Sequence, residues 1–194
     1  RGGCCFELNG LFYELLKGLG FSVRAVAARV VWQKNVTPPV LHRAAIVQLE
    51  GKEYYCDIGY GGPGPKGLLE LAQREQTVRG DRFTVEKNQQ GWYVISRYHE
   101  GRFCPLLCVD DREAEEADFL LMNFYCAKSE KVLFTQKRIV NLCTEDGSAA
   151  LTDDTLTIRK HKMDADGCAQ TEVRQIICSN AEERSCILRT YFGL

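Results

Sequence analysis

The sequence lacks long hydrophobic runs, an excess of either charge, and the leader pattern of a secreted protein. No apolar stretch in its 194 residues approaches the roughly 18 that are needed to span a bilayer, and no secretory signal pattern is present at its start. Lysine and arginine number 25 against 26 aspartate and glutamate, a net charge of −1. This balance favours neither a nucleic-acid partner nor a membrane surface, and we expect a cytoplasmic protein.

Paired metal-binding cysteines are also missing, although the chain has ten cysteines. There is no C-x-x-C motif, and Cys104-x-x-x-Cys108 has no neighbouring histidine or cysteine pair. We therefore predict no metal site. Most of the cysteines stand between apolar residues, as small buried thiols in a reducing compartment do, and only Cys4 and Cys5 call for another interpretation. The ten cysteines lie at positions 4, 5, 56, 104, 108, 126, 143, 168, 178 and 186.

An amphipathic helix is predicted directly after Cys4 and Cys5. Six apolar residues recur at the three-and-four spacing of one buried helical face, and Gly18 and Gly20 provide a stop. Either cysteine would lie in the first helical turn, where unpaired backbone N–H groups and the positive end of the helix dipole favour a thiolate. The six predicted face residues are Leu8, Leu11, Phe12, Leu15, Leu16 and Leu19.

Short antiparallel strands are predicted to follow this helix. Residues 21–32 are rich in valine and alanine and predict one long strand. Residues 42–49 and 52–58 predict a hairpin with its turn at Glu50-Gly51. The glycine- and proline-rich residues 59–65 must form a loop. Further strands are predicted at 82–87, 91–98 and 102–109.

The character of the sequence changes at the acidic residues 110–118. They precede an apolar run to Tyr125, as expected of a helix N-terminus, and Asn180 is a suitable N-cap for a last helix through Arg189. Between these helices the pattern predicts strands around 132–142, 149–151 and 155–160, with turns at 145–147 and 164–167.

These elements predict an α+β fold in three parts. Residues 1–22 would form the helix that carries the cysteines, residues 23–109 an antiparallel β barrel, and residues 110–194 a smaller α/β segment that serves as a lid. Short strands joined by tight turns are typical of a barrel or a sandwich.

A reactive cysteine needs a histidine to take its proton, and the chain has three. We expect His99, in a hairpin turn, and His161, among polar residues, to lie on the surface. His42 opens a strand whose hairpin partner contains Asp57. With the turn at Glu50-Gly51, paired residues have numbers that sum to 101, so Asp57 would face Ala44, on the same side of the sheet as His42.

A carboxylate among apolar neighbours requires a partner, and His42 is within diagonal reach of Asp57. This spacing leaves an alternative open. Asp57 could instead bond the amides of the following loop, with His42 on the surface beside it.

Three separated motifs resemble those of the arylamine N-acetyltransferase family. They are Arg1-Gly-Gly-x-Cys5-Phe-Glu-Leu-Asn9, then His42, and then Asp57-Ile-Gly-Tyr-Gly61. The resemblance implies a cysteine-proteinase-like fold in which Cys5 is the nucleophile, His42 activates it and Asp57 orients His42. Cys4 fills a variable position of the motif and is expected to be a bystander. The implied reaction is ping-pong: acetyl-CoA acetylates the cysteine, and an arylamine or arylhydrazine then accepts the acetyl group.

The resemblance also implies binding residues. Tyr60 and Phe134 would contact the arylamine, and Tyr125 and Thr135 would contact coenzyme A, with acetyl-CoA as the donor substrate and no metal. The alternative for these four residues is ordinary packing.

The sequence departs from the family in two places. Leu41 stands where the family has threonine, and the helical bundle that precedes the R-G-G motif in the family is not found. We expect either that the bundle lies outside this sequence or that its absence leaves the fragment poorly active. The rival functions are a thiol hydrolase, a macrolactam-forming amide synthase of the same fold, and a non-catalytic remnant that binds acyl-CoA or a partner.

Overall fold

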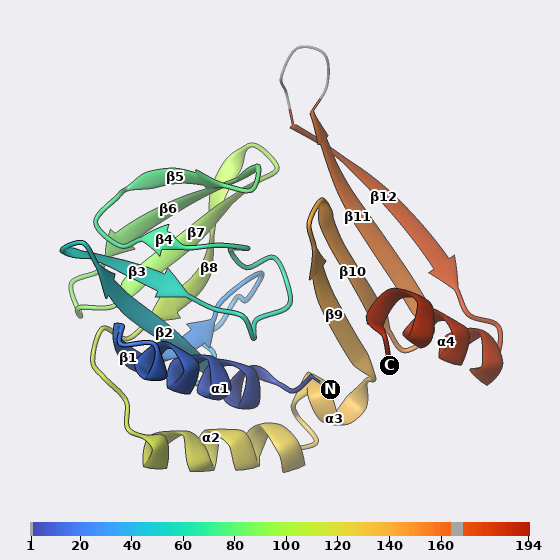
Figure 1. The fold of residues 1–194 in the computed structure, drawn as a ribbon, viewed down its shortest axis with the longest axis horizontal. Coiled ribbons are helices and arrows are strands. Elements are labelled where there is room, and N and C mark those ends of the chain that lie inside the picture. Colours follow the sequence, from blue (N-terminus) through green and yellow to red (C-terminus); the bar gives the residue numbers. More distant parts are fainter. Residues whose placement is uncertain (1, 164–168) are drawn as a thin grey trace. The chain divides into compact units, whose positions relative to one another are not determined.

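The computed structural model describes residues 2–163 and 169–194. These residues form two compact units, Gly2–Tyr125 and Cys126–Leu194 (Figure 1). Each unit is described by itself. The three-part division into 1–22, 23–109 and 110–194 stays a prediction about domains. Within the described ranges, no helix combines the length and the apolar character needed to cross a membrane.

The first unit is built on one eight-stranded antiparallel sheet in the order β4-β3-β2-β1-β8-β7-β6-β5. Its two edges, β4 and β5, are linked through a side chain. The Gln76 amide nitrogen donates to the Glu70 carbonyl at 2.8 Å, and its amide oxygen accepts from the Glu70 N–H at 2.9 Å. This link confirms the predicted antiparallel barrel. The strands are β1 (Ser22–Val30), β2 (His42–Leu49), β3 (Lys52–Cys56), β4 (Leu69–Glu70), β5 (Glu75–Val78), β6 (Asp81–Lys87), β7 (Tyr93–His99) and β8 (Arg102–Val109).

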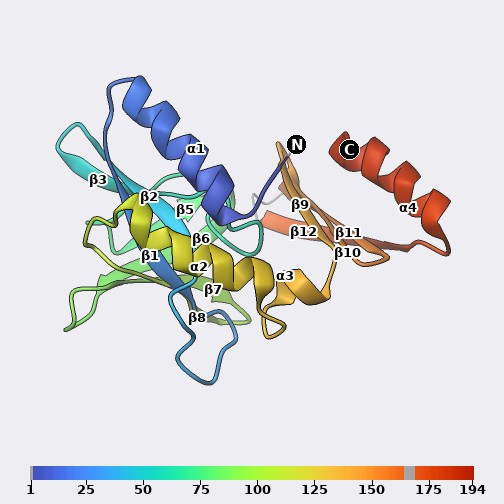
Figure 2. The ribbon, with the colours of Figure 1, turned by 90° about the horizontal axis from the view of Figure 1, so that it is seen from below.

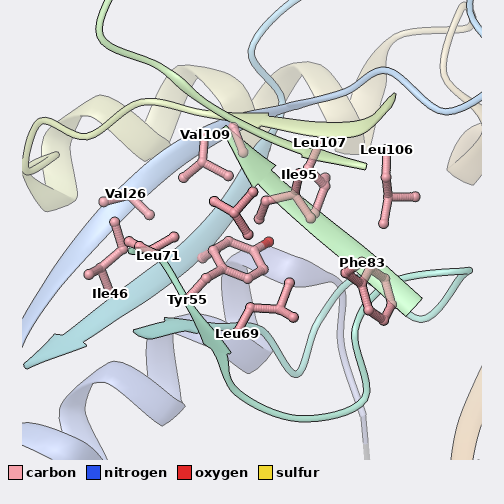
Figure 3. Close-up of a cluster of buried hydrophobic side chains, with 13 residues drawn as sticks. Val26, Ile46, Tyr55, Leu69, Leu71, Phe83, Ile95, Leu106, Leu107 and Val109 are labelled. Atoms are coloured by element: carbon pink, nitrogen blue, oxygen red, sulfur yellow. The ribbon is translucent and has the colours of Figure 1, made fainter. Parts of the chain in front are cut away.

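Alternate residues of these strands fill the interior of the barrel (Figure 3). Large side chains such as Tyr55, Phe83 and Ile95 are fully enclosed there, and each contributes roughly 1.5–3 kcal/mol by burial. The sequence missed β4 and β5, which are too short to show an alternating pattern. The interior cluster consists of Val26, Ala28, Ala44, Ile46, Tyr55, Leu69, Leu71, Phe83, Val85, Ile95, Leu106, Leu107 and Val109.

Helix α1 (Cys5–Gly18) begins at the predicted cysteine pair, but it is rotated from the predicted orientation. Its buried residues are Cys5, Phe6 and Asn9, and α1 packs on β1 and β2. Leu11 is 74% exposed and Leu15 54% exposed, whereas Leu8, Phe12 and Leu16 are half-buried, so the predicted apolar face is only partly covered by the described residues. The periodicity identifies an apolar stripe, but the polar Asn9 lies on the packed side because buried groups beyond the helix bind it.

Helix α2 (Glu116–Lys128) begins within the predicted acidic segment and crosses the boundary between the two units. In the first unit, Phe119 is 2% exposed and its ring lies 6.2 Å from that of Phe6 in α1. This pair joins the two helices, and Figure 2 shows α1 and α2 beside the sheet.

The second unit has a four-stranded antiparallel sheet in the order β12-β11-β10-β9. Leu151 and Leu156 are buried under Leu188 and Tyr191 near the C-terminus. Asn180 caps the last helix as predicted, because its side-chain oxygen accepts from the Glu183 N–H at 2.9 Å. The elements are α3 (Leu133–Gln136), β9 (Ile139–Thr144), β10 (Gly147–Thr152), β11 (Thr155–Met163), β12 (Ala169–Ile177), α4 (Ala181–Ile187) and a π-helical turn (Leu188–Phe192).

The predicted strand around 132–142 is wrong in its first part. Residues Leu133–Gln136 are helical, and the Thr135 hydroxyl donates to the carbonyls of Ser129 at 2.8 Å and Val132 at 2.9 Å. These local bonds close a turn and override the β preference of the residues in it. The predicted turn at 145–147 joins β9 to β10, whereas the predicted turn at 164–167 lies outside the described residues.

The predicted burial of the cysteines other than Cys4 and Cys5 is confirmed for Cys56, Cys126 and Cys178, while Cys104 and Cys108 are half-buried. Cys143 and Cys186 are exposed, so the prediction is wrong for both. Cys143 stands in β9, the edge strand of the second sheet. Apolar neighbours in sequence do not ensure burial there, since an edge strand is covered on fewer sides.

Candidate active site

Three elements bring the predicted site residues to one end of the barrel. Cys5 is the first residue of α1, His42 the first of β2, and Asp57 follows directly after β3. The hairpin register is the predicted one, with Ala45 opposite Cys56. The ladder ends at this pair, and Asp57 begins the loop that follows it.

The Glu50-Gly51 turn fixes this register. Both residues have positive φ, 51° and 77°, as the two central residues of a tight type I′ hairpin turn do. Because a two-residue turn fixes the strand register, the pairing keeps His42 close to Asp57.

His42 and Asp57 form a buried pair. Their Nε2 and Oδ2 atoms are 2.6 Å apart, and the side chains are 3% and 0% exposed. With the carboxylate ionised, this contact places the ring proton on Nε2 and leaves Nδ1 with a lone pair.

The Asp57 carboxylate has five donors. Oδ2 accepts from His42 and from the Tyr55 hydroxyl, the latter at 2.7 Å. Oδ1 accepts from the Asn9 amide at 2.9 Å and from the backbone N–H groups of Gly59 at 2.9 Å and Tyr60 at 3.0 Å. Asp57 therefore bonds the loop amides and His42 at once, and the alternative in which His42 lies on the surface is wrong, because His42 is buried.

Burial alone would raise the pKa of the Asp57 carboxyl. The charge and hydrogen bond of His42, together with the hydrogen bonds from Asn9 and Tyr55, outweigh burial and lower that pKa below its usual value. Asp57 is therefore ionised at neutral pH although it is fully enclosed.

Asn9 joins the helix to both sides of the hairpin, a role that the sequence patterns did not reveal. Its Nδ2 donates to the Arg43 carbonyl at 2.6 Å as well as to Asp57, and its Oδ1 accepts from the Ile58 N–H at 2.9 Å. The side chain is 0% exposed. The available signal was its place as the last residue of the first motif.

Cys5 is 6% exposed and lies against the backbone around His42. Its sulfur is 4.0 Å from the Leu41 carbonyl oxygen. Gly59 closes over the cysteine so tightly that a Cβ there would lie 2.6 Å from the Cys5 Cα. Glycine at this position thus allows the loop after Asp57 to touch the start of α1.

Cys4 and Cys5 influence each other's ionisation. The hydrogen bond between the two thiols lowers the pKa of Cys4 and raises the pKa of Cys5, and burial raises the pKa of Cys5 further. The Cys4 thiol also donates to the Glu7 carboxylate at 2.8 Å.

Tyr60 lies beside the pair. Its ring meets the His42 ring edge-on, with centroids 5.6 Å apart. Gly64 lies against the other side, where a Cβ would approach the Tyr60 ring to 2.3 Å. Burial raises the pKa of the Tyr60 hydroxyl, so this group stays protonated.

The other predicted binding residues are not gathered with this group by the described contacts. Tyr125 ends the first unit and is 39% exposed. Phe134 and Thr135 lie on α3 in the second unit, which is described by itself. The coenzyme and acceptor roles of these three residues stay predictions.

The remaining candidates lie apart from the site. The His99 side chain is 44% exposed, with its ring 5.3 Å from that of Trp32, as predicted for a surface residue. The His161 side chain lies outside the part of the chain whose side chains are described. Among the residues that the structure describes, no three His, Cys, Asp or Glu side chains gather as a metal site would require.

A thiol at a helix start, an imidazole and a buried carboxylate define a site for thiol-dependent acyl transfer or hydrolysis. Comparisons with known proteins narrow this class. A family model described as N-acetyltransferase matches residues 1–194. The chain therefore belongs to the arylamine N-acetyltransferase family.

Individual relatives agree with this assignment. The chain is 28% identical to an arylamine N-acetyltransferase / N-hydroxyarylamine O-acetyltransferase of Salmonella typhimurium over all of its length and 67% of the relative's. It is 43% identical to the arylamine N-acetyltransferase of Mycobacterium tuberculosis over 82% of its length and 58% of that relative's. The chain thus spans roughly three fifths to two thirds of these relatives' lengths.

Solved structures show the same fold. The Salmonella enzyme superposes with a TM-score of 0.87 at 26% identity, covering all of this chain and 69% of that one. The Mycobacterium marinum enzyme in complex with CoA gives 0.86 at 23% identity, again covering all of this chain and 70% of the other. At this identity the second likeness supports the fold alone.

Proposed function

We propose that the protein transfers an acetyl group from acetyl-CoA to an arylamine or arylhydrazine through a thioester on Cys5. Two observations carry this proposal: the buried His42–Asp57 pair, and the Cys5 sulfur 4.0 Å from the carbonyl oxygen of Leu41, the residue before His42. Catalytic roles for Cys5, His42 and Asp57 are part of it.

Proton positions follow from the hydrogen bonds. Asp57 engages Nε2 of His42, so Nδ1 is the nitrogen that accepts the Cys5 thiol proton. The thiolate attacks the acetyl carbonyl, the carbon–sulfur bond to CoA breaks, and the imidazolium returns its proton to the departing CoA thiolate. The first half-reaction therefore leaves an S-acetyl Cys5 and a neutral His42.

The second half-reaction uses the same groups in reverse. The amine nitrogen attacks the Cys5 thioester, His42 takes one amine proton through Nδ1, and the Cys5–acetyl bond breaks. The proton then returns to the Cys5 sulfur. Throughout both halves, the ionised Asp57 holds the ring and stabilises the imidazolium.

Substrate positions complete the proposal. Tyr60, whose ring adjoins His42, would stack on the flat acceptor, and Phe134 would join it. Tyr125 and Thr135 would approach coenzyme A. The names of the Salmonella and M. tuberculosis relatives and the CoA complex of the M. marinum enzyme support these substrate classes.

One assay tests the function. The protein is incubated with acetyl-CoA, with and without an arylhydrazine, while free CoA and the mass of the Cys5 peptide are followed. We expect one acetyl group on Cys5 that disappears with formation of the acetylated hydrazine. Acetate as the main product would indicate a thiol hydrolase instead, and an unmodified Cys5 would indicate a protein that only binds its ligands.

The assay needs a control for the other thiols. Cys143 and Cys186 are exposed, so a variant with serine at both positions should remove acetylation of these thiols without changing turnover. Loss of hydrazine acetylation in that variant would contradict the role given to Cys5. A larger acyl donor or an intramolecular amine substrate would extend the test to the amide synthase alternative.

A further inference from the structure

The Tyr55 hydroxyl stands in the middle of the site and has no role in the mechanism above. Tyr55 is 0% exposed and pairs with Ile46 on one side and Leu69 on the other, in the interior of the barrel. Figure 3 shows its ring among the apolar side chains of the interior cluster. A buried hydroxyl needs a hydrogen-bond partner, and this one donates to Oδ2 of Asp57 at 2.7 Å.

The two oxygens of Asp57 have different partners. Oδ1 is held by the Asn9 amide and two backbone N–H groups, which fix the plane of the carboxylate. Among the described residues, Oδ2 is shared by two side chains, His42 at 2.6 Å and Tyr55 at 2.7 Å. Because both donors polarise the same oxygen, the hydrogen bond from Tyr55 weakens the one from His42.

We propose that Tyr55 is a positioning residue that competes with His42 for Oδ2 of Asp57 and thereby sets how tightly the imidazolium keeps its proton. Burial and the Asp57 charge raise the pKa of the Tyr55 hydroxyl well above its usual value, so Tyr55 remains a donor at every pH at which the protein would work. His42 then makes a weaker hydrogen bond to Oδ2 than it would to an unshared carboxylate.

The test measures the reactivity of Cys5 and does not depend on acetyl transfer. Iodoacetate is an anionic probe whose reaction with a cysteine is assisted by a neighbouring imidazolium. Its rate with Cys5 should fall at high pH, when His42 loses its proton. The rate is followed on the Cys5 peptide by mass spectrometry, from acid to alkaline pH, in the parent protein and in Tyr55→Phe.

In Tyr55→Phe the ring stays but Oδ2 keeps only His42. We expect the alkaline limb of the Cys5 profile to move to higher pH by about half a unit or more. Tyr54→Phe is the matched control, because Tyr54 is the adjacent residue of β3 and alternation directs it to the other side of the sheet. Its profile should coincide with that of the parent.

Coincident profiles for Tyr55→Phe and the parent protein would overturn the proposal and leave Tyr55 a core residue only. If Tyr55→Phe does not fold, 3-fluorotyrosine at position 55 retains the packing and makes the hydroxyl a stronger donor. The alkaline limb should then move to lower pH, and an unchanged limb would again overturn the proposal.

The role of Tyr55 in catalysis rests on the proposed acetyl transfer, but the alkylation profile does not. If acetyl transfer exists, single-turnover acetylation of Cys5 should show the same displacement of its alkaline limb in Tyr55→Phe. If the parent protein forms no acetyl-cysteine, the proposed function fails, while the alkylation profile still decides whether Tyr55 acts on His42.

Discussion

Nε2 of His42 lies 2.6 Å from Oδ2 of Asp57, and neither side chain is accessible to solvent. This contact joins the first residue of one strand to the residue that follows the next strand. It is the fixed part of the site, because five donors in all hold the carboxylate in place.

Replacing the two adjacent cysteines one at a time should separate their roles. Cys5→Ser should lower acetyl-enzyme formation by about a thousandfold or more, because the serine hydroxyl is a far weaker nucleophile than a thiolate at neutral pH. Cys4→Ser should retain most of the activity, since the Cys4 thiol bonds Glu7 rather than the His42–Asp57 pair. Intact-mass measurement after brief exposure to acetyl-CoA checks both. If Cys4→Ser were inactive although its Cys5 still reacted, the acetyl transfer would have to be assigned to Cys4.

Asp57→Asn should slow acetylation by roughly three to four powers of ten, because an amide cannot stabilise the imidazolium and can reverse the ring tautomer. His42→Ala should have a similar effect. The double variant should lose little more than either single variant, since the residues act as a unit. Single-turnover rates of Cys5 acetylation measure all three. Additive losses would mean that the two residues act independently.

The ionised Asp57 should also make stability depend on acid pH. Its pKa is lowered in the folded state, so its contribution is fully present above the unfolded value near 3.9. That contribution is lost as pH falls through the folded value, because the unfolded chain then binds the additional proton. Urea unfolding of the parent protein and Asp57→Asn between about pH 6 and pH 2 should show a steeper decline for the parent. Parallel curves would contradict this assignment.

Asn9→Ala should destabilise the protein by about 2–4 kcal/mol. It removes the amide that bonds Asp57 and the Arg43 carbonyl, and it takes away the acceptor of the partly buried Ile58 N–H. Equilibrium urea unfolding measures the change. Leu11→Ala on the same helix is the control, because Leu11 is 74% exposed and should change stability by less than about 0.5 kcal/mol. Equal losses would show that the helix is not anchored through Asn9.

Gly59→Ala should impair both folding and Cys5 reactivity. The added methyl group would lie 2.6 Å from the Cys5 Cα and 2.8 Å from the Asn9 amide nitrogen, so α1 and the loop would have to separate. Gly18→Ala is the matched control, because its added methyl would meet no atom within 4 Å. Thermal unfolding and the iodoacetate rate of Cys5 report the two effects. A native Tm and an unchanged rate in Gly59→Ala would contradict the close contact.

The sequence by itself determined the local parts of the site. The cysteine pair and the helix periodicity located the start of α1, and the two-residue turn at Glu50-Gly51 determined the pairing that brings Asp57 towards His42. Both are short-range effects, in which neighbouring backbone geometry leaves few alternatives.

Only the tertiary structure decided how the helix is turned and what surrounds the carboxylate. Asn9 rather than the leucine stripe lies inward, because groups of β2 and the loop after β3 bind its amide. Tyr55 reaches Asp57 from the barrel interior, and Gln76 links the edge strands. Each of these contacts depends on the positions of several strands or helices at once, so no local pattern of residue types could have specified it.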